Sequence, residues 1–157
     1  MRTFFFIMIA TTLLYGSYTR DANSETVYDD QTDLTWEDGK NHKRNWEDAI
    51  NYCETLSLGG AQDWRLPNIN EMLSIVDYTA QNGVINPAFS FLSPIRYWSA
   101  TSNESDTTTA WYVNYFDSYS RSVIKTQALF VRCVRKGSLG TSSGSAGKMP
   151  AVLYLLQ

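Results

Sequence analysis

The sequence contains few of the residues that build metal sites and histidine-based active sites. Its 157 residues include one histidine, His42, and two cysteines, Cys53 and Cys133. A structural zinc site needs more ligands than these, and a catalytic triad needs a partner for the histidine that the chain does not offer nearby. We therefore expect no metal, no cofactor and no enzymatic activity.

The sequence also lacks an apolar run long enough to cross a bilayer. The run from Phe4 to Leu14 is too short for a spanning helix, and so is the apolar end of the chain. The first run follows Arg2 and precedes Gly16 and Ser17, which is the arrangement of a secretory signal peptide. We expect residues 1–20 to be this signal, although no clean small-x-small triplet directly follows the run to mark the cleavage site. The mature domain should have no stable membrane span.

Charge is moderate in total but uneven along the chain. The net charge is -3, with 43% hydrophobic residues, which is the profile of one ordinary soluble domain. Residues 21–77 contain 13 acidic and 4 basic side chains, whereas residues 78–157 contain 3 and 7. The second half could present a mildly basic surface to an anionic partner, or the two halves could interleave and cancel. We expect no nucleic-acid partner.

Periodic patterns are confined to residues 26–136, which we predict to be one domain. Residues 137–157 form a Gly/Ser-rich stretch and a short apolar tail, typical of a flexible linker. A hairpin is predicted near the start of the domain, between Val27 and Trp36. Its acidic turn, with Asp29, Asp30 and Asp33, invites a calcium interpretation. It lacks the glycine and distal glutamate of an EF-hand, so a solvated turn is the preferred interpretation.

Two helices are predicted after this hairpin. The first begins at the N-cap Asn45 and stops at Gly59 and Gly60. Its apolar face, which must be buried, consists of Trp46, Ala49, Ile50, Cys53 and Leu56. The second begins at Asn68, with Glu71 in a capping-box arrangement. Its core stripe is Ile69, Met72, Leu73 and Val76.

Strands dominate the rest of the domain, in the segments YWSATS (97–102), AWYVNYF (110–116) and ALFVRCVR (128–135). Alternation in the last segment places Leu129, Val131 and Cys133 on one inward face. Export leads to an oxidising compartment, where a thiol pair is expected to form a disulfide. Cys53 and Cys133 can meet if the first helix packs on the sheet. Closing a loop of roughly 80 residues would contribute on the order of 4 kcal/mol.

These segments, in this order, resemble the family of the C-terminal domain of the Legionella collagen-like adhesin, which is widespread in bacterial exported proteins. The resemblance covers nearly all of the predicted domain. Its motifs are TDLTW (32–36), WEDAINYC (46–53), LGGAQDWRLPNINEM (58–72), INPAF (85–89), YWSATS (97–102), AWYVNYF (110–116) and FVRCVR (130–135).

The resemblance implies an α+β, C-type-lectin-like fold, with two helices packed on small antiparallel sheets and one disulfide between an early helix and the final strand. It also implies adhesion to host surface or matrix components, including sulfated glycans. The chain lacks the collagen-like stalk that makes that adhesin multivalent. Asp33 stands where relatives commonly have glycine. The Glu-Pro-Asn, Gln-Pro-Asp and Trp-Asn-Asp strings of calcium-dependent lectins are absent, so a calcium–sugar site of that kind is not expected.

Candidate binding residues lie in the loops between the late strands, where Tyr, Ser and Asn offer adaptable contacts. They are Arg96, then Asn103 and Asp106 in one loop, and Asp117, Tyr119, Arg121 and Lys125 in the next. Three of them, Arg96, Arg121 and Lys125, could pair with sulfate or carboxylate groups. Wet hairpin turns are an equally good interpretation. A second basic cluster, Lys40, His42, Lys43 and Arg44, is predicted to be a solvated loop, and most of the five tryptophans are predicted to be core.

The leading hypothesis is a non-catalytic, adhesin-like binding module, secreted or in the cell envelope of a bacterium, in the periplasm or on the outer surface. Its partner would be a glycan or an extracellular protein, including a sulfated or acidic polymer. One alternative is a hypervariable ligand-binding protein on the same scaffold. The other is an envelope hydrolase with surface carboxylates, which would need acids with raised pKa values in a concave pocket.

Overall fold

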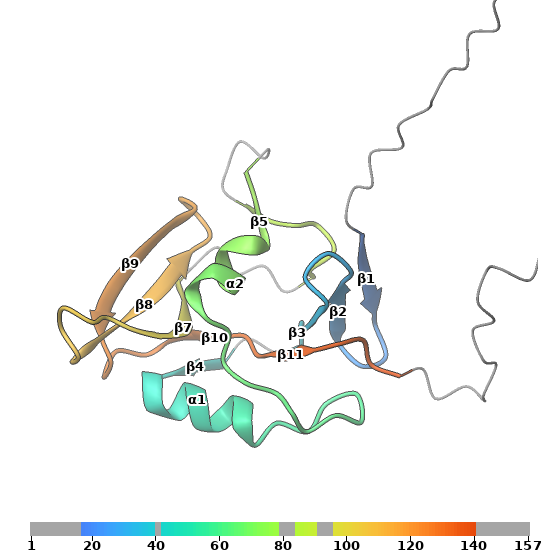
Figure 1. Cartoon of the computed structure of the whole chain (residues 1–157), viewed down its shortest axis with the longest axis horizontal. Coiled ribbons are helices and arrows are strands. Elements are labelled where there is room, and N and C mark those ends of the chain that lie inside the picture. The colour runs from blue at the N-terminus through green and yellow to red at the C-terminus, as the bar shows by residue number, and fades with distance from the viewer. Residues whose placement is uncertain (1–16, 40–41, 79–83, 91–95, 141–157) are drawn as a thin grey trace, which may run out of the picture.

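The computed structural model describes residues 17–39, 42–78, 84–90 and 96–140 (Figure 1). The predicted signal run and most of the predicted linker lie outside these residues. The helices are α1 (Trp46–Glu54) and α2 (Ile69–Ser74). The strands are β1 (Tyr18–Asp21), β2 (Thr26–Asp29), β3 (Leu34–Glu37), β4 (His42–Arg44), β5 (Val76–Asp77), β6 (Val84–Ile85), β7 (Arg96–Ser102), β8 (Thr109–Asn114), β9 (Tyr119–Ile124), β10 (Leu129–Val131) and β11 (Val134–Lys136).

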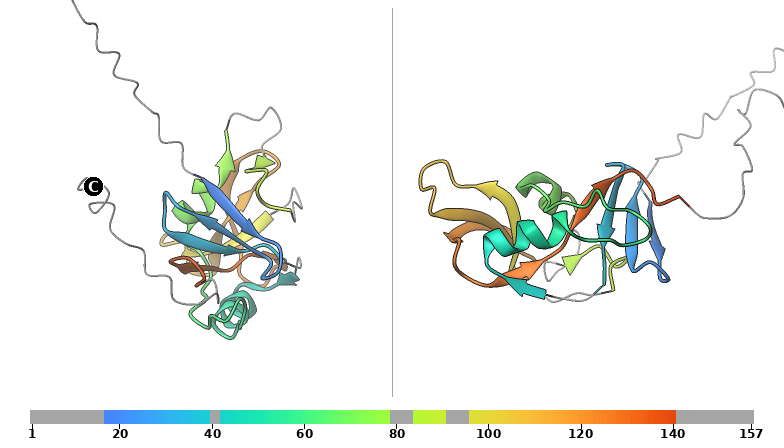
Figure 2. Two further views of the ribbon diagram at one scale, coloured as in Figure 1. Left: turned by 90° about the vertical axis from the view of Figure 1, so that its right-hand side faces the viewer. Right: turned by 90° about the horizontal axis from the view of Figure 1, so that it is seen from below.

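The fold is mixed, with two main sheets and two helices, as the sequence predicts. One sheet has the order β1-β2-β3-β11, the other β4-β10-β7-β8-β9, and β5 pairs with β6. The described pairs are antiparallel except β10 with β7, which is parallel. The segment β10–β11 runs across the molecule and joins the two main sheets, while α1 lies beside β4 and β10 (Figures 1 and 2). No helix among the described residues is long and apolar enough to cross a membrane.

The predicted N-terminal hairpin is present as β2 and β3. Its turn residue Asp33 has a φ of 56°, a left-handed conformation that favours glycine, which explains why a glycine also suits this position. The three turn carboxylates accept hydrogen bonds from protein groups: Asp29 from Thr32 Oγ1, Asp30 from Ser17, and Asp33 from the Tyr28 hydroxyl. These contacts support the interpretation as a turn.

A further strand, β1, which the sequence pattern did not predict, precedes this hairpin. It pairs with β2 from Tyr18 opposite Asp29 to Asp21 opposite Thr26. The Tyr18 ring packs against Phe89 with ring centroids 5.9 Å apart. Residues 18–20, which the predicted signal peptide includes, therefore have a place in the sheet.

Helix α1 begins as predicted and ends earlier than predicted. The Asn45 side chain accepts from the Asp48 amide at 2.9 Å, which is the predicted N-cap. The helix ends at Glu54. The next residue, Thr55, is the C-cap, and its amide donates to the Asn51 carbonyl. Gly59 and Gly60 do not end the helix. Both have positive φ, 59° and 77°, and they form the turn of a separate bridge between residues 58 and 61.

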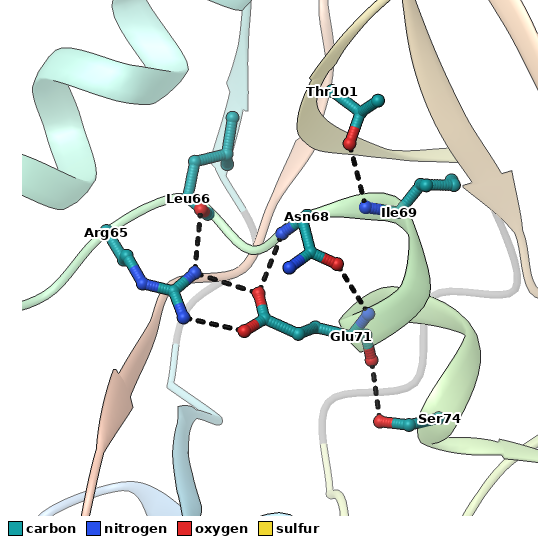
Figure 3. A network of polar contacts seen from close by, with 7 residues as sticks. All are labelled: Arg65, Leu66, Asn68, Ile69, Glu71, Ser74 and Thr101. Carbon is teal, nitrogen blue, oxygen red and sulfur yellow. Dashed lines mark hydrogen bonds and ion pairs between the residues drawn. The ribbon is translucent and has the colours of Figure 1, made fainter.

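Helix α2 has the predicted capping box. Asn68 accepts from the Glu71 amide at 2.9 Å, and Glu71 accepts from the Asn68 amide at 2.8 Å (Figure 3). Arg65 donates from its two terminal guanidinium nitrogens to the two Glu71 carboxylate oxygens. The Thr101 hydroxyl on β7 accepts from the Ile69 amide at 3.0 Å. The helix is shorter than the predicted stripe, because Val76 belongs to β5.

The last strand segment is divided between the two main sheets. β10 pairs with β4 and β7, and β11 pairs with β3. Leu129, Val131 and Cys133 are all buried in the cluster that contains Cys53, which confirms their predicted inward face. A disulfide joins Cys53 to Cys133, as predicted, and so ties α1 to the crossing segment.

Tryptophans divide into core and partly exposed groups. Trp36, Trp64 and Trp98 are at most 2% exposed, so these three are core, as predicted. Trp46 and Trp111 are only partly buried. The face of α1 is likewise buried in part: Ala49 and Cys53 are enclosed, whereas Ile50 and Leu56 pack at the edge of the cluster.

Ion pairs connect the acidic and basic halves of the chain. Buried Asp38 pairs with Arg132 at 3.1 Å and with Arg20, and Asp63 pairs with Arg135 at 2.6 Å. The two halves therefore interleave, and part of their charge cancels inside the fold.

Candidate binding surface

The structure places the seven predicted binding residues at the two ends of one hairpin sheet, β7–β8–β9. Strand β8 separates the ends by about 20 Å. We call one end the β8–β9 end; it contains Arg96, Asp117, Tyr119 and Arg121. The other, the β7–β8 end, contains Asn103, Asp106 and Lys125. Lys125 therefore lies with Asn103 and Asp106 and not, as predicted, in the loop with Asp117 and Arg121, because β9 runs back along β8 and ends beside Thr108.

The β8–β9 end combines cations with aromatic rings. Arg121 Nη1 lies 2.8 Å from Asp117 Oδ2 and its guanidinium lies 5.5 Å from the Tyr119 ring centroid. Arg96 lies 5.7 Å from the ring of Tyr112. Desolvation acts to raise the pKa of Asp117, but hydrogen bonds from Arg121 and the Tyr119 amide lower it overall. Asp117 is therefore ionised at neutral pH, and it balances part of the positive charge.

Exposed aromatic side chains gather at the same end. Phe116 lies in the β8–β9 turn and is 67% exposed, and Tyr119, the first residue of β9, is 64% exposed. Tyr115, which begins this turn, is buried, and desolvation raises the pKa of its hydroxyl. We call Phe116 and Tyr119 the aromatic patch.

One member of this patch, Phe116, was not among the predicted binding residues. Phe116 follows a strand and precedes Asp117 and Ser118, so it is an apolar residue among turn residues. That context was the signal that could have identified it, because a large apolar side chain in a turn has no core to enter.

The β7–β8 end is a self-satisfied turn. Asn103 Nδ2 donates to Thr109 Oγ1 at 3.1 Å, and Asp106 accepts from the Thr108 hydroxyl at 2.6 Å. Hydrogen bonds from Thr108 lower the pKa of Asp106. Lys125 Nζ lies 4.2 Å from the Trp46 ring centroid. The polar groups here bond mainly to one another, as expected for a wet turn.

The second basic cluster is a strand, not the predicted solvated loop. Residues 42–44 form β4, which pairs with β10. Lys43 lies 4.8 Å from the Phe130 ring and Arg44 lies 4.6 Å from the Tyr52 ring. Lys40 lies outside the described residues. Pairing with β10 explains the difference, because residues 42–44 form backbone pairs along the edge of β10 that faces away from β7.

Two buried acids outside the hairpins have structural partners. Glu37 is 6% exposed and accepts from the Tyr52 hydroxyl at 2.6 Å and from the Cys133 amide at 3.2 Å. Burial raises the pKa of Glu37. Asp38 accepts from the Ser90 amide as well as pairing with Arg132. Both carboxylates are occupied by groups that hold the fold together.

The described residues contain no group of three or more His, Cys, Asp or Glu side chains that could hold a metal ion. A surface hollow of about 820 Å³ lies beside the Gly59–Gly60 turn and is lined in part by Asp63, Arg135 and Leu139. None of the seven predicted binding residues lines it.

Comparison with known proteins gives one match to a family. The model described as the Lcl C-terminal domain matches residues 25–135, which includes both helices, both cysteines and the three strands β7, β8 and β9. No curated protein matches the chain.

Proposed function

The chain belongs to the Lcl C-terminal domain family, and from this premise we propose that it is a bacterial exported binding module without catalytic activity. The β8–β9 end of the hairpin sheet would contact the ligand, a glycan or an extracellular protein. We further propose that the fold is C-type-lectin-like, with residues 26–136 as its family-defined portion and residues 137–157 as a linker and tail. The disulfide between α1 and the segment before β11 supports this, since the family resemblance implies such a bond.

The observation that carries the proposal is the aromatic patch. Phe116 and Tyr119 lie in and beside one turn of the hairpin sheet, and each is more than 60% exposed. Exposed apolar groups of this size are costly in water unless a partner covers them, and their grouping marks a contact surface. Tyrosine suits both candidate ligands, because it offers a ring for stacking and a hydroxyl for hydrogen bonding.

Neighbouring polar groups favour a ligand that carries some negative charge. Arg121 already contacts Asp117, so an incoming sulfate or carboxylate would compete with that carboxylate. Arg96 lies over Tyr112 and adds a second cation on the same side of the sheet. We therefore propose a mixed contact, in which aromatic rings supply most of the contact area and the guanidinium groups bind acidic groups.

Export to the bacterial envelope or exterior is part of the proposal. The disulfide supports it, because such bonds persist in oxidising compartments. An envelope hydrolase is the competing function. The buried acid with a raised pKa, Glu37, gives it no support, since both of its oxygens accept hydrogen bonds within the fold. The hypervariable alternative predicts sequence variation concentrated in the two turns.

The test compares variants at the two ends of the sheet. Phe116→Ser, Tyr119→Ser and Arg121→Ala change the β8–β9 end. Ile124→Ser and Lys125→Ala are matched controls at the β7–β8 end, where Ile124 is 55% exposed. Binding would be measured on glycan arrays, on matrix proteins and on a heparin column at graded salt.

We expect each change at the β8–β9 end to weaken binding about tenfold or more, as for residues central to an interface. Only the Arg121→Ala effect should shrink as salt rises, because salt screens exposed charges. Loss of binding in the control variants alone, or no binding by the wild type to any probe, would contradict the proposal.

A further inference from the structure

The carboxylate of Asp30 holds the backbone and side chain of Ser17, the first residue that the structure describes. The Ser17 amide nitrogen donates to Asp30 Oδ1 at 2.8 Å, and its hydroxyl donates to Oδ2 at 2.8 Å. The Asp30 amide donates back to the Ser17 carbonyl at 3.2 Å. Ser17 is thus fixed to the β2–β3 turn at the point where the chain enters β1.

Strand β1 itself is built into the domain. Its four residues pair in register with β2, and Tyr18 joins the core cluster that contains Phe89. Arg20 pairs with Asp38, which is 1% exposed. Losing β1 would uncover the side of Phe89 that packs on Tyr18 and would remove Arg20, an arginine that pairs with the buried Asp38 carboxylate.

This arrangement bears on where an export peptidase cuts. These enzymes require a small residue before the scissile bond and favour a second one two positions earlier. Between the apolar run and β1, the small residues are Gly16 and Ser17, and Leu14 and Tyr15 stand at the earlier position. A small-x-small triplet occurs further on, at residues 22–24, but a cut after Ser24 would release β1. A cut after Ser17 would remove the residue that Asp30 holds.

We propose that a signal peptidase hydrolyses the bond between Gly16 and Ser17, and that the new α-ammonium group of Ser17 forms an ion pair with Asp30. Water adds to the Gly16 carbonyl carbon and the C–N bond breaks. Gly16 leaves as a carboxylate, and the Ser17 nitrogen takes up protons to become an ammonium. This nitrogen already lies 2.8 Å from Asp30 Oδ1, so the cation forms beside its partner.

The inference rests on the export included in the proposed function. The first experiment expresses the full chain in a bacterial host, purifies it from the periplasm or medium, and determines its N-terminus by mass spectrometry. We expect Ser17. A start at Tyr18 or Glu25 would overturn the cleavage site and leave export intact, whereas an unprocessed chain that stays in the cytoplasm would overturn both.

Periodate gives an independent chemical readout. It oxidises an N-terminal serine, a 1,2-amino alcohol, to an aldehyde that hydrazides label, and it does not act in this way on an N-terminal Tyr or Glu. The purified protein should therefore be labelled at one site. Absence of labelling would overturn the assignment of Ser17 as the first residue.

The ion pair has its own test, the rate at which the α-amine is acylated near neutral pH. Asp30→Asn removes the carboxylate charge, so the free amine should be more abundant and acylation about 1.5 to 5 times faster. Asp106→Asn is the matched control, an exposed aspartate that also accepts hydrogen bonds in a turn. Equal rates in wild type and Asp30→Asn would overturn the ion pair.

Discussion

At the scale of single residues, the buried polar side chains do more to hold the fold together than the exposed polar side chains that stand out in the sequence. Glu37 is the last residue of β3 and Asp38 is the next residue. Each has partners from distant segments of the chain. Glu37 binds Tyr52 on α1 and the Cys133 amide, while Asp38 binds arginines from β1 and the segment between β10 and β11. No local pattern predicts these contacts, because the partners come together only in the fold.

The raised pKa of Glu37 predicts how stability depends on pH. A carboxyl group whose pKa is higher in the folded than in the unfolded state contributes stability that is present below its ordinary pKa and lost as pH rises through the folded value. Glu37→Gln removes this dependence. The free energy of unfolding of the variant, measured with urea, should therefore increase relative to wild type as the pH rises above the ordinary glutamate pKa of about 4.

Glu71→Gln provides the control of opposite sign. Desolvation acts to raise the pKa of Glu71, but hydrogen bonds from Arg65 and the Asn68 amide lower it overall. Its contribution is present above the ordinary pKa and lost as pH falls. The Gln variant should be less stable than wild type near neutral pH and approach it in acid. The same pH trend in both variants would contradict the assigned causes.

At the scale of elements, the sequence predicted where the helices begin better than where they end. Both helix starts were predicted correctly, because an N-cap is a local contact between Asn and an amide three residues on. Both helix ends were wrong, since the residues after Glu54 and Ser74 serve other pairings, a bridge and β5. The alternation of side chains predicted the late strands. It did not predict the break between β10 and β11, which arises because these two strands pair in different sheets.

The Gly59–Gly60 turn allows a direct test. Both glycines have left-handed φ, so alanine should cost about 1 kcal/mol at either position. A Cβ at Gly59 would also collide with the Leu139 side chain, whereas nothing lies within 4 Å of one at Gly60. Gly59→Ala should therefore be the more destabilising change in urea unfolding, and Leu139→Ala should relieve part of its excess cost. Equal effects of the two alanines would contradict the packing of Leu139.

At the scale of the whole molecule, two features connect the sheets: the crossing segment β10–β11 and the disulfide that anchors it to α1. Replacing both Cys53 and Cys133 with alanine opens a loop of 80 residues. We expect the free energy of unfolding to fall by about 4 kcal/mol, mainly because the unfolded chain gains freedom. Reduced wild type should unfold at a similar urea concentration, and a loss below about 1 kcal/mol would contradict this account.

Strand β1 gives the second prediction at this scale. A chain that begins at Glu25 lacks the β1 ladder, the Tyr18 contact and one partner of Asp38. It should be about 2–4 kcal/mol less stable than a chain that begins at Ser17. Arg20→Ala in the longer chain separates the ion pair from the strand. Equal midpoints for the two chain lengths would show that β1 is dispensable.

The sequence by itself determined the mixed fold class, the family, both helix caps and the pairing of the cysteines, because these depend on local periodicity, local contacts or the presence of only two thiols. The tertiary structure decided the rest. It paired residues 42–44 with β10, gave Glu37 and Asp38 their partners, and packed Tyr18 of β1 against Phe89. Such facts depend on contacts between segments far apart in the chain, and the free energy of those contacts has no signature in any one segment.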